Sequence, residues 1–236
     1  AWRMRDLTRN QVRQMWKDYM GLVACVDHEA GRLLSALREL GVEGETLVLF
    51  SADHGKSLGE WGATEKGFFD SEVWRVPFIL AGPGVEAQGT VRSDVCELID
   101  TGRTLLSLAG LDVPSSFRGR NLIDDAAPSV GFAQIGWPDG EAPLVRALDL
   151  KMGPTAASMR VAVRTQRYRM DVTWYRDGCH VDLPEADGNL FDLDADPEER
   201  ENLWSAPHAQ PIVRDLWAAL DGWFDALDKP QEIFGA

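Results

Sequence analysis

The segment TLVLFSADHGKSLGEWGATEKGFFDSEVWRVPFIL spans residues 46–80 and decides how the rest of the chain is interpreted. Its first five residues form an apolar run, which is typical of a buried parallel strand rather than of a strand with one exposed face. Asp53, His54 and Gly55 follow directly after that strand. Because ligands of open α/β sheets bind at the carboxyl ends of the strands, we expect the active site in the loop before the second apolar run, residues 76–80.

The composition describes a globular and acidic chain. Its 236 residues are 44% hydrophobic, enough for one large domain or a domain with a small appendage. The formal net charge of −14 argues against nucleic acid or an anionic membrane as a partner, and no apolar run is long enough to span a membrane. The three cysteines match neither a zinc site nor a disulfide framework, and we expect Cys25 and Cys96 to pack in the core.

Hydrophobic periodicity predicts the secondary structure. Thr8 and Gln11 fit a capping box that opens one long helix, Thr8–Leu40, lying against a sheet. The other predicted elements are strands at 46–50, 76–80, 130–135 and 189–193, a helix from Ser93 or Asp94 to Leu108, a hairpin of 159–165 and 168–175 with its arginines on the outer face, a helix at 211–227, and loops at 110–119 and 136–154.

This order of elements predicts an α/β fold. Residues 1–125 are expected to form a mixed sheet flanked by helices. Residues 126–236 are expected to form a small α+β subdomain, a four-stranded antiparallel sheet closed by a C-terminal helix.

Asp53 and His54 offer a carboxylate oxygen and an imidazole nitrogen side by side. An Asp after a strand is also a common turn or cap residue, so the pair alone is a weak signal. Lys66 lies in the same loop, and a metal ligand pair with a nearby ammonium suits a tetrahedral oxyanion ester. Lys56 and Arg75 are weaker candidates for the same role. His28 lies in the long helix, and we leave it out of the site.

Four stretches, taken in order, resemble the sulfatase family of the alkaline-phosphatase-like superfamily. The resemblance covers nearly the whole chain and is to the C-terminal half of an enzyme of arylsulfatase or phosphonate monoester hydrolase type. The stretches are YMGLVACVDHEAGRLLSAL at 19–37, the segment 46–80, LIDTGRTLLSLAGL at 98–111 with GRNL at 119–122, and LFDLDADPEERENL at 190–203.

The resemblance implies roles for three residues. Asp53 and His54 would be two ligands of one divalent cation, with calcium the first candidate and manganese or zinc the alternatives. Lys66 would be catalytic and substrate-binding, contacting the sulfate or phosphoryl group and the leaving oxygen. The family's usual DHGE motif reads DHGK here, with Lys56 in the acidic position.

The family nucleophile is a formylglycine made within a C/S-x-P-x-R motif, and none of the three cysteines stands in that context. We therefore expect a fragment whose formylglycine and first half lie elsewhere in the protein, with a degenerate relative as the alternative. The expected partners are that N-terminal half and a small-molecule sulfate, phosphate or phosphonate ester.

Two other functions stay open at this point. Residues 55–60, GKSLGE, also fit a phosphoethanolamine- or glycerol-phosphate-type transferase, although such enzymes are membrane-tethered and carry Tyr-x-His-Gly where this chain has Glu65, Lys66 and Gly67. A non-catalytic metal-binding remnant would keep the same fold. Trp137 and His180 lie in C-terminal loops, and we do not assign either to the pocket because Trp and His are common at protein surfaces. The natural substrate, homo-oligomerisation and the compartment (periplasmic or secreted, or cytoplasmic) are not fixed by these patterns.

Overall fold

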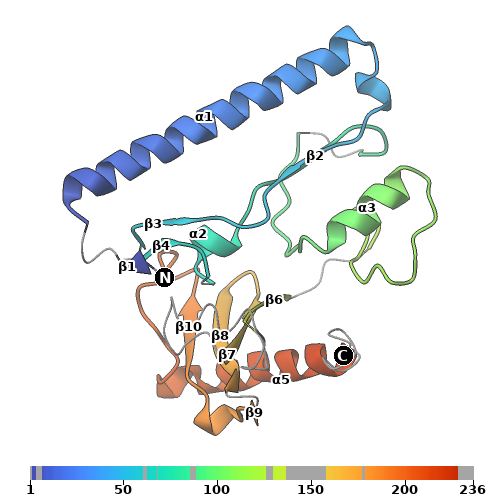
Figure 1. Cartoon of the computed structure of the whole chain (residues 1–236). Coiled ribbons are helices and arrows are strands. Elements are labelled where there is room, and N and C mark those ends of the chain that lie inside the picture. Colours follow the sequence, from blue (N-terminus) through green and yellow to red (C-terminus); the bar gives the residue numbers. More distant parts are fainter. Residues whose placement is uncertain are drawn as a thin grey trace. The chain divides into compact units, whose positions relative to one another are not determined.

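The computed structural model describes residues 2–3, 7–60, 63–67, 69–85, 89–125, 130–136, 158–176 and 179–227 (Figure 1). The chain forms two compact units, residues 1–92 with 98–126 and residues 93–97 with 127–236. In the part of the chain that the structure describes, no helix combines the length and the apolar character needed to cross a membrane.

The helices and strands of the first unit are β1 (Trp2–Arg3), α1 (Arg9–Glu39), η2 (Glu43–Glu45), β2 (Val48–Ser51), β3 (Ser57–Leu58), β4 (Ala63–Glu65), α2 (Ser71–Trp74), β5 (Phe78–Ala81) and α3 (Asp100–Leu108). Those of the second unit are β6 (Gly131–Ile135), β7 (Ser158–Arg164), β8 (Tyr168–Arg176), β9 (Cys179–His180), η5 (Leu183–Glu185), β10 (Gly188–Asp192), η6 (Pro207–Ala209) and α5 (Gln210–Ala226).

The long helix α1 begins with the predicted capping box. The hydroxyl of Thr8 accepts a hydrogen bond from the backbone N–H of Gln11 (3.3 Å), and the side chain of Gln11 accepts one from the backbone N–H of Thr8 (2.8 Å). These two bonds satisfy backbone donors that a helix start leaves without a helical partner. Figure 1 shows α1 as one uninterrupted rod.

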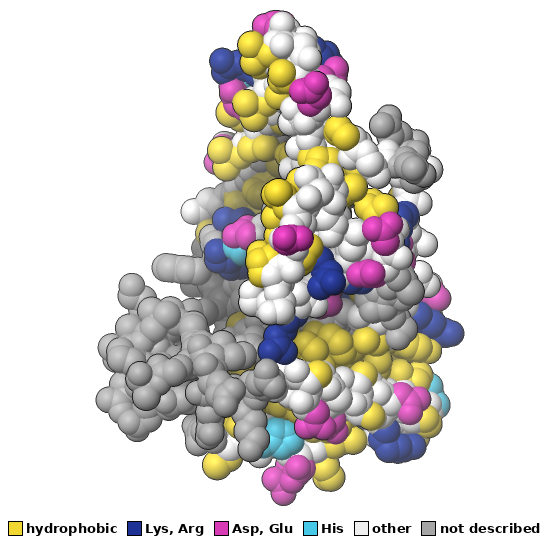
Figure 2. All heavy atoms as spheres, turned by 90° about the vertical axis from the view of Figure 1, so that its right-hand side faces the viewer, with side chains coloured by type: hydrophobic (Ala, Val, Ile, Leu, Met, Phe, Trp, Pro, Cys, Tyr) yellow, Lys and Arg dark blue, Asp and Glu magenta, His cyan; other side chains and the backbone are white. Residues whose placement is uncertain are grey.

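The expected burial of one face of α1 against a sheet is not found among the described residues, although its first turns contact β3. No residue of α1 is buried, and apolar side chains that the periodicity assigns to a buried face are open to solvent, Leu33 being 70% exposed. Cys25 is exposed on the same helix, so the expectation that it packs in the core is wrong. Apolar side chains are also visible at the surface in the space-filling view (Figure 2).

The two strands that bracket the site loop pair with each other, antiparallel. Val48 of β2 faces Ala81 of β5, and Ser51 faces Phe78. The expectation of a buried parallel strand is therefore wrong for the described residues, where β2 and β5 form a two-stranded sheet with no buried position. A strand that is apolar on both faces is buried only where layers cover both of its faces, and these residues supply none.

A second small sheet, in the order β1-β4-β3, carries the far side of the loop. Both residues of β3 are buried, and Leu58 pairs with Thr64 of β4. The indole N–H of Trp16 on α1 donates to the carbonyl of Leu58 (2.9 Å), which fastens the first turns of the helix to this sheet.

The helix predicted from Ser93 or Asp94 starts later, as α3 at Asp100. Residues 93–97 have no regular secondary structure and belong to the second unit, where the carboxylate of Glu97 accepts from the backbone N–H of Phe132 (2.7 Å). The bond to Phe132 holds Glu97 beside the start of β6 in the second unit, whereas α3 belongs to the first unit. Cys96 is exposed rather than in the core, which corrects the second cysteine expectation.

The second unit is an antiparallel sheet in the order β10-β8-β7-β6, with β9 added on β8. The four predicted strands are confirmed, and the two-residue β9 is an addition that the sequence did not signal. Of the loop predicted at 136–154, everything after Gly136 lies outside the described residues, and so does Trp137.

The core of the second unit lies between this sheet and α5, as the alternation on the strands and the helical spacing of 211–227 predict. Trp174 of β8 stacks on Phe224 of α5 with ring centroids 4.8 Å apart, and Phe132 stacks on Trp223 at 5.0 Å. The most deeply buried members are Met159, Val161, Val163, Met170, Val172, Leu190, Ala209, Val213 and Leu220.

The opposite face of this sheet holds a buried ion network instead of an outer row of arginines. Arg169 is 2% exposed, and its guanidinium donates to Asp171 (2.5 Å) and to Glu199 (3.0 Å). Arg160 reaches the same Asp171 carboxylate. The expected outward placement is therefore wrong for Arg169, because two carboxylates neutralise its charge inside the protein.

Candidate functional site

The turn after β2 is shaped by a glycine that lies directly against α2. The backbone N–H of Gly55 donates to the carbonyl of Val73 (2.7 Å), and a Cβ at Gly55 would lie 1.9 Å from the carbonyl oxygen of Glu72. Only a residue without a side chain fits so close to another backbone. This contact fixes where Asp53 and His54 leave the strand.

The two oxygens of the Asp53 carboxylate have different surroundings. Its Oδ1 accepts from the backbone N–H of His54 (2.9 Å), the turn role that is common for Asp after a strand. Its Oδ2 lies 3.3 Å from Nε2 of His54, and the side chain is 84% exposed. The turn-stabilising role and the metal-ligand role of Asp53 therefore use different oxygens and are compatible.

His54 is held in one tautomer by its two neighbours. Its Nδ1 lies 2.9 Å from the carbonyl of Gly55, and its Nε2 lies 2.7 Å from Nζ of Lys66. Because an ammonium can only donate, Nε2 is the accepting nitrogen and Nδ1–H donates to the carbonyl. A carbonyl that accepts from Nδ1–H, with Nε2 left as the nitrogen that carries the lone pair, is also the arrangement found in metal-ligating histidines.

Lys66 reaches this pair from just beyond β4. The β3–β4 pairing brings the chain back past the turn, so residues that are far apart in sequence meet at one imidazole nitrogen. The structure thus brings Asp53, His54 and Lys66 together. Arg75, the weaker candidate, is exposed at the end of α2.

Two residues considered for the site lie elsewhere. His28 is exposed on α1. His180, on β9 of the second unit, packs edge-on against Trp174 with ring centroids 4.7 Å apart, and its Nδ1 lies 3.7 Å from Asp182.

The donor pair fits a divalent cation. One oxygen and one nitrogen 3.3 Å apart match two neighbouring ligands at about 2.0–2.3 Å from a single ion. Among the described residues, no group of three or more His, Cys, Asp or Glu side chains could hold a metal. Asp53 and His54 could therefore contribute two ligands of a site, and the ammonium of Lys66 would have to leave the lone pair of Nε2.

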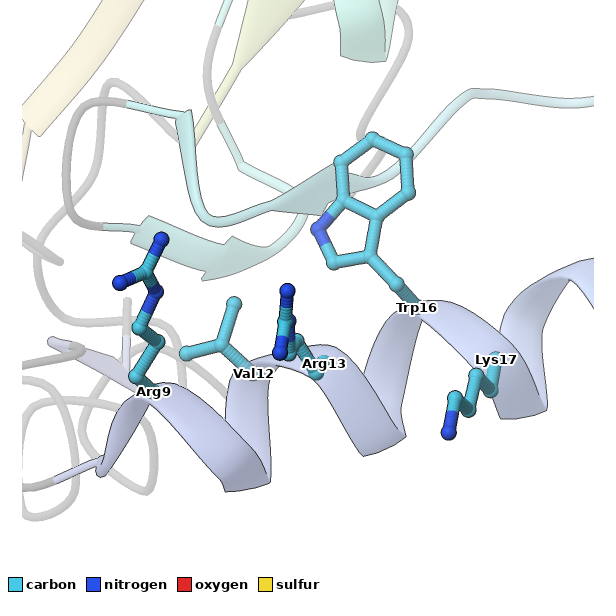
Figure 3. Close-up of a pocket in the computed structure, with 5 residues that line it drawn as sticks. All are labelled: Arg9, Val12, Arg13, Trp16 and Lys17. Atoms are coloured by element: carbon cyan, nitrogen blue, oxygen red, sulfur yellow. The ribbon is translucent and has the colours of Figure 1, made fainter.

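A pocket of about 590 Å³ lies along the first turns of α1 (Figure 3), and its described lining residues are not among the site residues predicted from the sequence. Its lining residues are Arg9, Val12, Arg13, Trp16 and Lys17. The sequence signal for this pocket is the four-residue spacing of Arg9, Arg13 and Lys17, which matches no catalytic motif.

Structural comparison defines the class of protein. A putative sulfatase from Bacteroides thetaiotaomicron superposes with a TM-score of 0.77 at 22% identity, over 97% of this chain and 46% of its own. A phosphonate monoester hydrolase from Silicibacter pomeroyi gives 0.76 at 23% identity, over 94% and 43%. The chain therefore shares the α/β fold of these two proteins, and the predicted fold class is confirmed.

Sequence comparison then gives the family. Residues 3–111 match the family model described as Sulfatase. The N-acetylglucosamine-6-O-sulfatase of Bacteroides thetaiotaomicron is 28% identical over 215 residues, and the choline-sulfatase of Rhizobium meliloti is 32% identical over 226. These matches confirm the resemblance to the sulfatase family. The chain covers 35% and 38% of these two relatives, while they cover 89% and 92% of it.

Proposed function

We propose that this chain supplies part of the active site of a metal-dependent sulfate ester hydrolase. Asp53 and His54 are two ligands of one divalent cation, and Lys66 contacts the sulfate group and the leaving oxygen. The observation that carries the proposal is the convergence on Nε2 of His54, with a carboxylate oxygen at 3.3 Å and an ammonium at 2.7 Å. The family match at residues 3–111 supports it.

The bound cation would supply polarisation of the ester oxygens, and calcium is the first candidate, with manganese and zinc as alternatives. The carbonyl of Gly55 keeps the proton of His54 on Nδ1, so that Nε2 remains a donor to the ion. The ammonium of Lys66 binds an oxygen of the ester and neutralises negative charge that grows on the leaving oxygen. The formylglycine nucleophile would come from protein outside these 236 residues, since no cysteine here has the required context.

A phosphonate or phosphate ester is the second candidate substrate. A multifunctional alkaline phosphatase superfamily protein of Trinickia caryophylli is 28% identical over 230 residues, and this chain covers 41% of it. Sulfate and phosphonate monoesters share a tetrahedral oxyanion centre, and the trio of Asp53, His54 and Lys66 suits both. The nucleophile-bearing part and its loops would decide between them.

The test is metal binding and turnover by the complete protein. Calorimetric titration with Ca²⁺, Mn²⁺ and Zn²⁺ should show affinity reduced at least about tenfold in Asp53→Ala and in His54→Ala. Asp112→Ala removes the same charge at another exposed position and should bind like wild type. Hydrolysis of an aryl sulfate should fall with metal affinity. Unchanged metal binding in both site variants would refute the ligand assignment, and faster hydrolysis of an aryl phosphonate would favour the second substrate class.

A further inference from the structure

The pocket on α1 joins a cationic stripe to an apolar one. Arg9, Arg13 and Lys17 recur at four-residue spacing, which places them along one side of the helix, and Val12 and Trp16 form the neighbouring stripe. In Figure 3, Arg9, Arg13 and Trp16 project toward the strands, whereas the ammonium of Lys17 lies on the other side of the helix. The two guanidinium groups are therefore the charges that face the cavity.

These charges are not neutralised within the described residues. Neither Arg9 nor Arg13 has a carboxylate within ion-pair distance there, and the first turn of α1 holds no acidic residue. The nearby carboxylates are engaged, since Asp18 accepts from Gln14 (2.7 Å) and Glu60 accepts from the backbone N–H of Leu58 (2.6 Å). In a chain with a net charge of −14, this is a local positive site.

The indole of Trp16 gives the pocket a fixed wall. Its N–H donates to the carbonyl of Leu58 on β3 over 2.9 Å, so the ring is held in place while the side chain remains partly exposed. Leu58 pairs with Thr64 on β4, and Lys66 follows two residues later. The ribbon that holds Trp16 in place is thus the one that leads to Lys66, which lies roughly 7 Å along the chain from Thr64 at about 3.3 Å per residue.

We propose that this pocket binds a second oxyanion group of the substrate, a sulfate or carboxylate carried on a ring beyond the ester that is cleaved. The inference rests on the proposed function and deepens it. Two guanidinium groups one helical turn apart suit bidentate binding of a planar or tetrahedral oxyanion, and the indole offers a flat apolar surface to the ring that carries it. The preferred substrates are therefore organic molecules with at least two negative groups.

The experiment compares two probes on the complete protein by calorimetry: an unsaturated chondroitin disaccharide with one sulfate and the same disaccharide with two. Wild type should bind the disulfated probe about tenfold or more tightly than the monosulfated one. The double variant Arg9→Gln/Arg13→Gln should lose that preference. Arg32→Gln, which removes a charge farther along the same helix, should keep it. Thermal unfolding of each variant confirms that the fold is intact.

Three further outcomes decide the matter. Equal affinity of wild type for the two probes would overturn the proposal. A double variant that loses affinity for inorganic sulfate while wild type shows no preference would identify a free-anion site and would also overturn it. In Lys66→Met, the preference for the disulfated probe should survive. If Lys66→Met keeps the preference but wild type hydrolyses no ester, the proposed function is refuted and the assignment of this pocket is retained.

Discussion

The ammonium of Lys66 and a metal ion would compete for one lone pair, that of Nε2 on His54. Nζ lies 2.7 Å from this nitrogen, and Oδ2 of Asp53 lies 3.3 Å from it on another side. Two acceptor atoms this close repel each other unless a cation lies beside them, and Lys66 provides that cation in this structure. Once a divalent ion takes its place, the ammonium is free to turn toward an anionic substrate.

We therefore expect Lys66→Met to separate metal binding from catalysis. Divalent metal affinity should be unchanged or higher, because a competing cation is gone, while turnover of an aryl sulfate should fall at least about tenfold. Lys56→Met makes the same charge change in the same loop and should stay within roughly threefold of wild type. Calorimetry and steady-state kinetics on the complete protein measure both effects. A turnover equal to wild type in Lys66→Met would remove this residue from the mechanism.

Gly55→Ala should damage the site loop through backbone contact alone. The added Cβ would lie 1.9 Å from the carbonyl oxygen of Glu72, so either the turn or α2 has to move. We expect a loss of about 1–3 kcal/mol in unfolding free energy together with weaker metal binding. Gly21→Ala is the control, since no atom lies within 4 Å of its Cβ and alanine favours a helix by about 0.5–1 kcal/mol. Equal stability of the two variants in urea titrations would contradict the steric argument.

Glu199→Ala should be among the most destabilising changes in the second unit. Its carboxylate and the guanidinium of Arg169 are each 2% exposed and lie 3.0 Å apart. Removing one partner of a buried pair typically costs about 3–5 kcal/mol, because the other charge stays in the protein. Glu198→Ala removes an exposed carboxylate next to it, paired with an exposed Arg200, and should change stability by less than about 1 kcal/mol. Denaturant unfolding of both variants decides whether burial makes the difference.

Arg167→Gln should reduce stability in a pH-dependent way. The guanidinium of Arg167 donates to Asp192 (2.7 Å), and this bond lowers the pKa of that carboxyl below its usual value. A lowered pKa in the folded state stabilises the fold above the unfolded-state pKa of about 4, and the contribution is lost as the pH falls through the folded-state pKa. The difference between wild type and Arg167→Gln should thus be constant well above the unfolded-state pKa of Asp192 and should shrink as the pH falls through its lowered folded-state pKa. Unfolding curves in which the difference widens in acid would contradict this assignment.

Local patterns in the sequence were sufficient where one short-range interaction decides the structure. The capping box of Thr8 and Gln11, the alternation of the β7–β8 hairpin and the helical spacing of α5 all appear as expected. The meeting of Asp53, His54 and Lys66 was suggested by their place in one loop, and the family resemblance then supplied their roles. No spacing rule alone states that residues 53 and 66 approach each other.

The wrong expectations share a physical cause. Whether β2 is parallel, whether Cys25 is buried and where α3 begins all depend on which other segments lie alongside. Periodicity reports that a face is apolar, but it does not report what covers that face. The burial of Arg169 is the reverse case, since its two carboxylate partners, Asp171 and Glu199, compensate a charge that composition would place in water.

The lack of buried side chains on α1 has a consequence for local unfolding of the chain. Isolated helices gain little stability from hydrogen bonding alone, and this one has 31 residues without a buried side chain. Its amide protons should therefore exchange with solvent far faster than those of β7 and β8, whose side chains Val161 and Val172 are fully buried. Local unfolding of α1 should therefore require little free energy. The hydrogen bond from Trp16 to Leu58 would transmit that unfolding to the ribbon that carries Lys66.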